Sequence, residues 1–212
     1  MNAQMILDSS NGLPIAIVVC LITGYLFGSF PTGYVIGRLH HMDIRDSGSG
    51  NSGTTNALRT MGKMAGLLTF VGDVAKTMIP MLIVRAVLQD NEEFASFMGL
   101  IVGFGAVLGH NFPCWLKFKG GKGFASFLGM SLGIHWKYFI VIGICIIVIT
   151  LVTKYIVLAT MATVISYPIY LFYDTRNWII FAMITVLSLI IIFKHYKNLV
   201  RIAKGEEFKF KI

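Results

Sequence analysis

Long apolar runs alternate with short polar segments along most of the chain, and the runs lack the strict apolar–polar alternation that marks a strand. A helix needs roughly 20 mainly apolar residues to cross the hydrocarbon core of a bilayer, and fewer where its polar ends reach the interface. The pattern therefore predicts an all-α polytopic membrane protein. About seven transmembrane helices are expected, at 13–37, 66–88, 94–110, 123–135, 138–153, 155–173 and 177–193.

Two of these segments, 123–135 and 138–153, are short for a full crossing. A re-entrant pair accompanied by five full crossings is therefore the competing interpretation of the same pattern. We favour seven crossings, because that count agrees with the distribution of charge described next. No repeat, linker or change of composition divides the chain, so a single domain over 1–212 is predicted.

Positive charge is concentrated in alternate connections between the apolar segments. The acidic loop at 89–93 and the short turn at 174–177 lie between the positive clusters. Because Lys and Arg accumulate on the cytoplasmic side, this distribution predicts an N-terminus outside and a C-terminus in the cytoplasm. The residues in these clusters are Arg38, Arg45, Arg59, Lys63, Lys117, Lys119, Lys122, Lys154, Lys194, Lys197, Arg201, Lys204, Lys209 and Lys211.

The composition agrees with a membrane protein, since 56% of the residues are hydrophobic and only 13% are charged. A soluble domain usually carries about a quarter charged residues. The net charge of +8 fits contact with anionic lipid headgroups, and without a basic soluble domain no nucleic-acid partner is expected. No Cys or His spacing indicates zinc, so no metal site is predicted.

The first polar segment, DIRDSGSGNSGTTNALR at 43–59, is longer than a turn between two helices needs. Glycine lets the backbone approach a ligand closely, and successive N–H groups in such loops form concave anion sites. Ser, Thr and Asn add further donors, and Arg offers a bidentate fork for phosphate. A solvated linker is the alternative interpretation. The candidate binding residues are Arg45, Ser49, Gly50, Asn51, Thr55, Asn56 and Arg59.

The second polar segment, GHNFPCWLKFKGGKG at 109–123, resembles a phosphate-binding loop but lacks the full GxxxxGK[ST] pattern, so nucleotide hydrolysis is not predicted. What remains is Lys122 flanked by Gly120, Gly121 and Gly123, which suits an anion held by backbone N–H groups and one ammonium. His110, at a segment end, is interpreted as an interface residue rather than a catalyst.

The third polar segment, KHYKNLVRIAKGEE at 194–207, follows the last apolar run. His195 and Asn198 are three residues apart and therefore share one helix face. An amphipathic exit helix is the alternative. All three segments are predicted on the cytoplasmic side, where they are expected to meet around phosphate-bearing substrates. Inside the bilayer, Asp73 and Lys76 are expected to form a structural ion pair, because isolated charges are costly there.

Together, GSFPTGYVIGRL, DIRxxGSGNxGxTNxLR, GHNFPxxLKFKGGKG and KHxxNLxRxxxGEE resemble the motifs of the bacterial acyl-phosphate:glycerol-3-phosphate acyltransferase family, in family order and over 28–207. The resemblance implies seven helices and acyl transfer from acyl phosphate to the 1-hydroxyl of glycerol 3-phosphate, giving lysophosphatidic acid and phosphate for phospholipid synthesis. No cofactor, metal, acyl-CoA or acyl carrier protein is implied. A monomer in the cytoplasmic membrane is expected.

By the same resemblance, Ser49 and Arg59 match the essential residues of the first motif, and Lys122 with its glycines matches the second. His195 and Asn198 match the third motif, and Glu206 corresponds to a structural glutamate. Two positions depart from the family pattern: Thr54 stands where Ala is usual, and Thr77 stands where Gly is common. The general base stays open between His195 and a phosphate oxygen of the substrate.

Three other functions fit parts of the sequence. His41 and Asp46 form an H-x-x-x-x-D pattern that resembles another class of glycerolipid acyltransferases, but two fixed positions arise easily by chance. A transporter of organic phosphates is expected to carry midmembrane polar groups and internal repeats. A metal-dependent phosphatidyl transferase needs several Asp on adjoining helices, which Asp43 and Asp46 do not supply.

Overall fold

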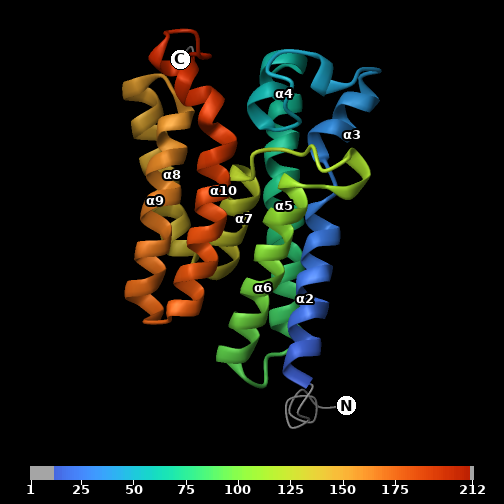
Figure 1. Ribbon diagram of the computed structural model, residues 1–212, viewed down its shortest axis with the longest axis vertical. Helices are drawn as coiled ribbons and strands as arrows, with labels where there is room; N and C mark the ends of the chain where they lie inside the picture. Colours follow the sequence, from blue (N-terminus) through green and yellow to red (C-terminus); the bar gives the residue numbers. More distant parts are fainter. Residues whose placement is uncertain (1–11, 211–212) are drawn as a thin grey trace. The chain divides into compact units, whose positions relative to one another are not determined.

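The structure is a computed structural model that describes residues 12–210, and every regular element in that range is helical (Figure 1). It divides into two compact units, one ending at His135 and the other beginning at Trp136, which are described separately. The first contains α2 (Gly12–Gly28), α3 (Thr32–Leu39), η1 (Ile44–Asp46), α4 (Thr54–Met61), α5 (Lys63–Val87), α6 (Glu92–Asn111), η2 (Cys114–Leu116) and α7 (Phe124–Ile134). The second contains α8 (Trp136–Thr153), α9 (Ile156–Thr175) and α10 (Trp178–Ala203).

Each of the seven predicted apolar segments contains a helix, and the prediction of an all-helical membrane protein is confirmed. Six stretches within the described residues are long and apolar enough to span a bilayer. The remaining segment forms α7, whose 11 residues rise only about 17 Å against a hydrocarbon core of about 30 Å. Seven full crossings, one domain over 1–212 and the orientation of the termini stay predictions. The N-terminal residues 1–11 and Lys211 lie outside the described residues.

The first predicted segment, 13–37, lies within the candidate span Gly12–Leu39, in which the helix is interrupted between α2 and α3. Pro31 stands immediately before α3 and carries no backbone N–H to continue the ladder of α2. The apolar run continues on both sides of this break, so hydrophobicity alone did not reveal it.

Small residues let α2 and α6 pack backbone to backbone, and the two helices run side by side in Figure 1. Gly24 and Gly28 of α2 lie against the backbone of Val102 and Ala106, where an added Cβ would collide with a carbonyl oxygen. Gly105 and Gly109 of α6 lie in the same way against the backbone of α2. These facing GxxxG spacings are typical of helix association in membranes, where close van der Waals packing replaces the hydrophobic effect.

In the first unit, α6 is the most buried of the long helices and contacts α2, α5 and α7. Asn91 begins α6 as its N-cap, accepting a hydrogen bond from the Phe94 N–H at 3.0 Å. The shorter helices α3 and α4 pack on α5, with Gly72 against Thr32 and Gly66 against Leu58. These contacts fix the first polar segment, which lies between α3 and α5 in sequence, on the amino-terminal part of α5.

In the second unit, α9 packs against both α8 and α10. Tyr138 of α8 stacks on Tyr167 and Tyr170 of α9, with ring centroids 5.0 and 3.9 Å away. Asn177 caps α10 by accepting from the N–H groups of Ile179 and Ile180. Helix α10 continues beyond the predicted apolar segment to Ala203 and therefore carries most of the third polar segment on its last turns.

Candidate active site

Asn56 organises the first polar segment from within. Its buried amide nitrogen has two hydrogens, which are shared among three carbonyl oxygens, those of Ile44 at 2.9 Å, Ser47 at 3.0 Å and Asn51 at 2.8 Å. Its amide oxygen accepts from the backbone N–H of Ser49 at 2.8 Å. Asn56 is 2% exposed, and these hydrogen bonds of its side chain are all with backbone groups of the loop. Asn56 therefore shapes the loop, and its predicted role in substrate binding stays a prediction.

Glycine is needed at the two sharp points of this loop, because Gly48 and Gly50 have φ values of +62° and +71°. Asn51 closes the next turn by accepting from the N–H of Gly53 at 2.9 Å. The result is a folded-back loop in which Ser49 and Gly50 are exposed. Helix α4 follows at Thr54 and carries Thr55, half-buried, and Arg59, exposed in its last turn. The loop therefore presents a hydroxyl and a guanidinium to its surroundings.

Arg45 is held by neighbours within the same segment. Its Nε and Nη2 donate to the two carboxylate oxygens of Asp43 at 2.9 and 2.6 Å. The guanidinium also lies 4.9 Å from the ring centre of Tyr34, on which Arg38 stacks as well. The hydrogen bonds from Arg45 hold the pKa of Asp43 at about 2, well below its usual range, and the carboxylate raises the pKa of Arg45. Asp43 therefore balances the charge of Arg45, which was predicted to bind substrate.

The glycine tract around Lys122 folds back onto the carboxyl end of α6. The N–H of Gly121 donates to the carbonyl of His110 at 3.0 Å, and that of Gly120 donates to the carbonyl of Asn111 at 3.3 Å. A Cβ at Gly121 would collide with Nε2 of the His110 ring. The glycines are thus required for close packing on α6, whatever ligand the loop binds. Half-buried Lys122 extends from this anchored backbone.

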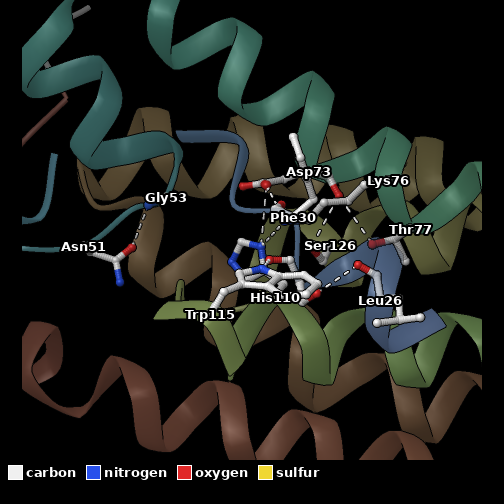
Figure 2. Close-up of polar contacts among 11 residues, drawn as sticks. Leu26, Phe30, Asn51, Gly53, Asp73, Lys76, Thr77, His110, Trp115 and Ser126 are labelled. Atoms are coloured by element: carbon white, nitrogen blue, oxygen red, sulfur yellow. Dashed lines mark hydrogen bonds and ion pairs between the residues drawn. The ribbon is translucent and has the colours of Figure 1, made fainter. Parts of the chain in front are cut away.

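The expected ion pair between Asp73 and Lys76 is present, with Nζ 2.8 Å from Oδ1 and both side chains buried. A third group belongs to the cluster, because Nδ1 of His110 lies 2.9 Å from the Lys76 ammonium and 3.5 Å from Asp73 (Figure 2). The sequence did not predict this contact, since His110 follows Lys76 by 34 residues and lies on another helix.

His195 and Asn198 lie on α10, which confirms the predicted helix, and both side chains are buried. Nδ1 of His195 lies 2.8 Å from the carbonyl oxygen of Ile191. Because a carbonyl oxygen only accepts, Nδ1 carries the hydrogen. In the neutral ring Nε2 is then the nitrogen with the lone pair, which is the tautomer that a general base requires.

The glutamate that anchors the tail is Glu207. One of its oxygens accepts from the Asn198 side chain at 2.8 Å, and the other accepts from Nε of Arg201 at 2.7 Å. The side-chain contacts with α10 are therefore made by Glu207, and the structural role predicted for Glu206 stays a prediction. Glu206 instead donates its backbone N–H to the carbonyl of Arg201 at 2.8 Å, in a turn where Gly205 has φ +72°. That turn decides which glutamate faces α10.

The candidate residues therefore fall into two sets. The first unit carries those of the first and second polar segments, and the second unit carries those of the third. Within each set, polar contacts fix the loop around Asn56, the glycine tract before Lys122 and the pair His195 and Asn198. The members of the first set are Arg45, Ser49, Gly50, Asn51, Thr55, Asn56, Arg59, Gly120, Gly121, Lys122 and Gly123, and those of the second are His195, Asn198 and Glu206.

Comparison with known proteins decides the family, because the model of the glycerol-3-phosphate acyltransferases matches residues 18–205. The chain belongs to this family. The glycerol-3-phosphate acyltransferase of Bartonella quintana is 39% identical over 189 residues, which cover 89% of each chain. That of Staphylococcus haemolyticus is 39% identical over 199 residues, which cover 92% of this chain and 98% of the relative.

Solved structures of a glycerol-3-phosphate acyltransferase share the fold. The crystal structure of PlsY, an integral membrane enzyme, in its glycerol 3-phosphate form has a TM-score of 0.82 and 34% identity, covering 92% of this chain and 96% of that one. The lysophosphatidic acid form has a TM-score of 0.79 and 33% identity. These matches support the PlsY family, and this chain is an integral membrane acyltransferase of that family.

Proposed function

We propose that this enzyme transfers a fatty acyl group from acyl phosphate to the 1-hydroxyl of glycerol 3-phosphate, releasing lysophosphatidic acid and inorganic phosphate. The observation that carries the proposal is the pair of folded-back glycine loops, one followed by α4 with Arg59 and the other carrying Lys122, in a chain of the glycerol-3-phosphate acyltransferase family. The PlsY structures with glycerol 3-phosphate and with lysophosphatidic acid support the acceptor and the product.

Acyl phosphate suits a site built from cations and hydroxyl groups. It is a mixed anhydride, so the phosphate leaves without strong protonation. The 1-hydroxyl oxygen of glycerol 3-phosphate forms a bond to the carbonyl carbon, and the bond from that carbon to the phosphate oxygen breaks. Phosphate departs with the electron pair, and the hydroxyl proton passes to a base. The protein then has to bind, align and neutralise two anionic substrates.

Charge neutralisation is the largest electrostatic requirement of such a reaction. Two unit negative charges 4 Å apart repel each other by roughly 4 kcal/mol at an effective dielectric constant of 20. We assign one phosphate to Arg59 and Ser49, whose fork and hydroxyl match phosphate oxygens, and the other to Lys122. Exposed Gly50 and half-buried Asn51 and Thr55 line the first loop. The glycines beside Lys122 bring its backbone close to the second anion.

The third motif supplies the remaining groups. We assign His195 and Asn198 to orienting glycerol 3-phosphate, with Glu207 holding the amide of Asn198. The proton acceptor is Nε2 of His195 or a phosphate oxygen of the substrate. The His195→Gln variant distinguishes these two proton acceptors. A near-normal kcat in this variant assigns the role of base to the substrate. A loss of kcat of several orders of magnitude assigns it to His195.

We further propose that the enzyme works as a monomer in the cytoplasmic membrane, with its active site on the cytoplasmic side. The supporting feature is the concentration of Lys and Arg in the same connections that carry the three motifs. Labelling of single introduced cysteines from one side of the membrane tests the orientation. A cysteine near position 90 should react only from outside, and one near position 118 only from the cytoplasm.

The donor is tested with purified protein, labelled glycerol 3-phosphate and EDTA. Palmitoyl phosphate and palmitoyl-CoA are supplied in separate reactions at equal concentration. Lysophosphatidic acid should form with palmitoyl phosphate and not with palmitoyl-CoA. Product that forms only with palmitoyl-CoA, or only after a divalent metal is added, would contradict the proposal. The Arg59→Gln variant is the control for a contaminating acyltransferase, since it should lose the product.

A further inference from the structure

The buried cluster of Asp73, Lys76 and His110 lies directly beneath the glycine tract of Lys122. The side chains of all three are at most 8% exposed, and they come from α5 and α6. The Lys76 ammonium has three close acceptors: Oδ1 of Asp73 at 2.8 Å, the carbonyl of Phe30 at 2.8 Å and Nδ1 of His110 at 2.9 Å (Figure 2). The first contact is an ion pair, and the other two are hydrogen bonds of the ammonium.

The ammonium fixes the tautomer of His110. A protonated lysine only donates, so Nδ1 of His110 must accept from it with a lone pair. The hydrogen of the neutral ring is then on Nε2. Nε2 lies at the ring edge that faces Gly121, where a Cβ would collide with it. The contacts of Lys76 and Asp73 with Nδ1 therefore leave the Nε2 edge of the His110 ring against Gly121.

The same histidine holds the glycine tract through its backbone. Its carbonyl accepts from the N–H of Gly121 at 3.0 Å, one residue before Lys122. The segment that precedes the tract is also tied to the end of α2, because the indole N–H of Trp115 donates to the carbonyl of Ser29 at 2.8 Å. Lys76 binds the carbonyl of Phe30, the next residue. One buried ammonium therefore connects α5, the break after α2 and the anchor of the Lys122 loop.

Stability alone is a weak reason for such a cluster. A buried ion pair often contributes no more than well-packed apolar side chains of similar volume, and charges in a membrane span are costly. Directional hydrogen bonds, in contrast, fix the relative positions of the groups that they join, which apolar packing does not do as specifically.

We propose that Asp73, Lys76 and His110 are positioning residues that hold the backbone of residues 120–123, and thereby Lys122, in the geometry that binds one substrate phosphate. The inference rests on the proposed function for the role of Lys122, and on contacts within the first unit for the rest. Removing the cluster should displace a binding cation while leaving the reacting groups present. The KM for one phosphate substrate should then rise about 10- to 100-fold, with a much smaller change in kcat.

The test uses the double variant Asp73→Asn/Lys76→Met, which removes both charges together and leaves no uncompensated buried ion. Arg85→Met is the matched control, because Arg85 also lies on α5 and binds the carbonyl of Gly133 at 2.6 Å, at the far end of α7. The control should lower the Tm without raising KM. If the cluster acts through Lys122, the triple variant Asp73→Asn/Lys76→Met/Lys122→Met should have the same KM as Lys122→Met alone. The proposal is overturned by a triple variant in which the two separate increases in KM multiply, or by a double variant whose KM equals that of the wild type.

Hydrogen exchange of the Gly121 amide gives a readout that does not depend on activity. This amide should exchange faster in the double variant than in the wild type, and unchanged exchange overturns the proposal. Wild-type protein that makes no lysophosphatidic acid from acyl phosphate, combined with faster exchange in the variant, refutes the proposed function alone. Should the double variant fail to fold, His110→Asn keeps an acceptor near the Nδ1 position for Lys76 and should raise KM less than His110→Leu. The reverse order contradicts the proposal.

Discussion

The side-chain amide of Asn198 donates to Glu207 at 2.8 Å, across the turn that ends α10. The second oxygen of Glu207 accepts from Arg201, one helical turn further along. Both Asn198 and Glu207 are buried, so this carboxylate orients a polar side chain that has little freedom to find another partner. The adjacent Glu206 is exposed and makes its hydrogen bond through the backbone.

Neighbouring glutamates therefore give a matched pair of variants. Glu207→Gln should reduce kcat/KM by about 10- to 100-fold and lower the Tm, because a buried amide and a guanidinium lose their charged acceptor. Glu206→Gln should remain within about two-fold of wild type. Steady-state kinetics and thermal unfolding in detergent measure both. Equal losses in the two variants would contradict the assignment of the contact to Glu207.

Asn56 provides the second prediction, since one amide binds four backbone groups of the first loop. Asn56→Asp keeps the acceptor but removes the two N–H donors that three carbonyl oxygens share. The free energy of unfolding should fall by about 2–4 kcal/mol, and activity should fall with it. Thr60→Val, which removes only one hydroxyl bond to the Asn56 carbonyl, should cost less than about 1 kcal/mol. A stable, active Asn56→Asp enzyme would show that the loop does not depend on this amide.

Asp43 predicts a specific pH dependence of stability. Its folded pKa is about 2 against an ordinary value of 3.8, so folding favours the charged form. The resulting stabilisation is complete above the unfolded pKa and disappears as pH falls through the folded one. The Tm difference between wild type and Asp43→Asn should therefore be constant above about pH 5 and shrink between about pH 4 and pH 2. At neutral pH the pair should contribute no more than about 1 kcal/mol, because Arg45 is partly exposed. A difference that persists unchanged to pH 2 would contradict the origin of the shift.

Glycine packing between α2 and α6 predicts a contrast between two substitutions. Gly28→Ala places a Cβ against the backbone of Ala106, which cannot move aside as a side chain can. We expect a loss of about 1–3 kcal/mol, measured as a lower Tm. Gly143→Ala in α8 meets no atom within 4 Å and should be neutral or slightly stabilising. Comparable losses in both variants would show that the close approach is not the cause.

Periodicity and hydrophobicity were sufficient to locate the helices, because a bilayer requires long apolar segments whatever their detailed packing. They also placed His195 and Asn198 on one helix face, since that relation depends only on spacing. The break at Pro31 was missed because the apolar run continues on both sides of it. The short α7 was located within one residue at each end, because polar or turn residues bound its apolar run, but its length alone does not decide whether it crosses the bilayer.

Contacts between distant segments account for the remaining differences. His110 joins Lys76 only through the packing of α6 on α5, and no local pattern records that contact. The choice of Glu207 over Glu206 depends on the backbone turn at Gly205. The substrate contacts predicted for Asn56 and Arg45 stay predictions, because polar character in a polar loop does not distinguish a structural role from a binding role. In the structure, Asn56 is bound within that loop and Arg45 is paired with Asp43.

The central claim is that one acyl group moves from acyl phosphate to glycerol 3-phosphate in a single reaction on this enzyme. The most direct measurement follows both products in the same time course, with label in the phosphate of palmitoyl phosphate and a different label in glycerol 3-phosphate. Inorganic phosphate and 1-acyl lysophosphatidic acid should appear at equal rates, and phosphate release should require the acceptor. Phosphate released without the acceptor, or lysophosphatidic acid formed without an equal amount of phosphate, would contradict the account.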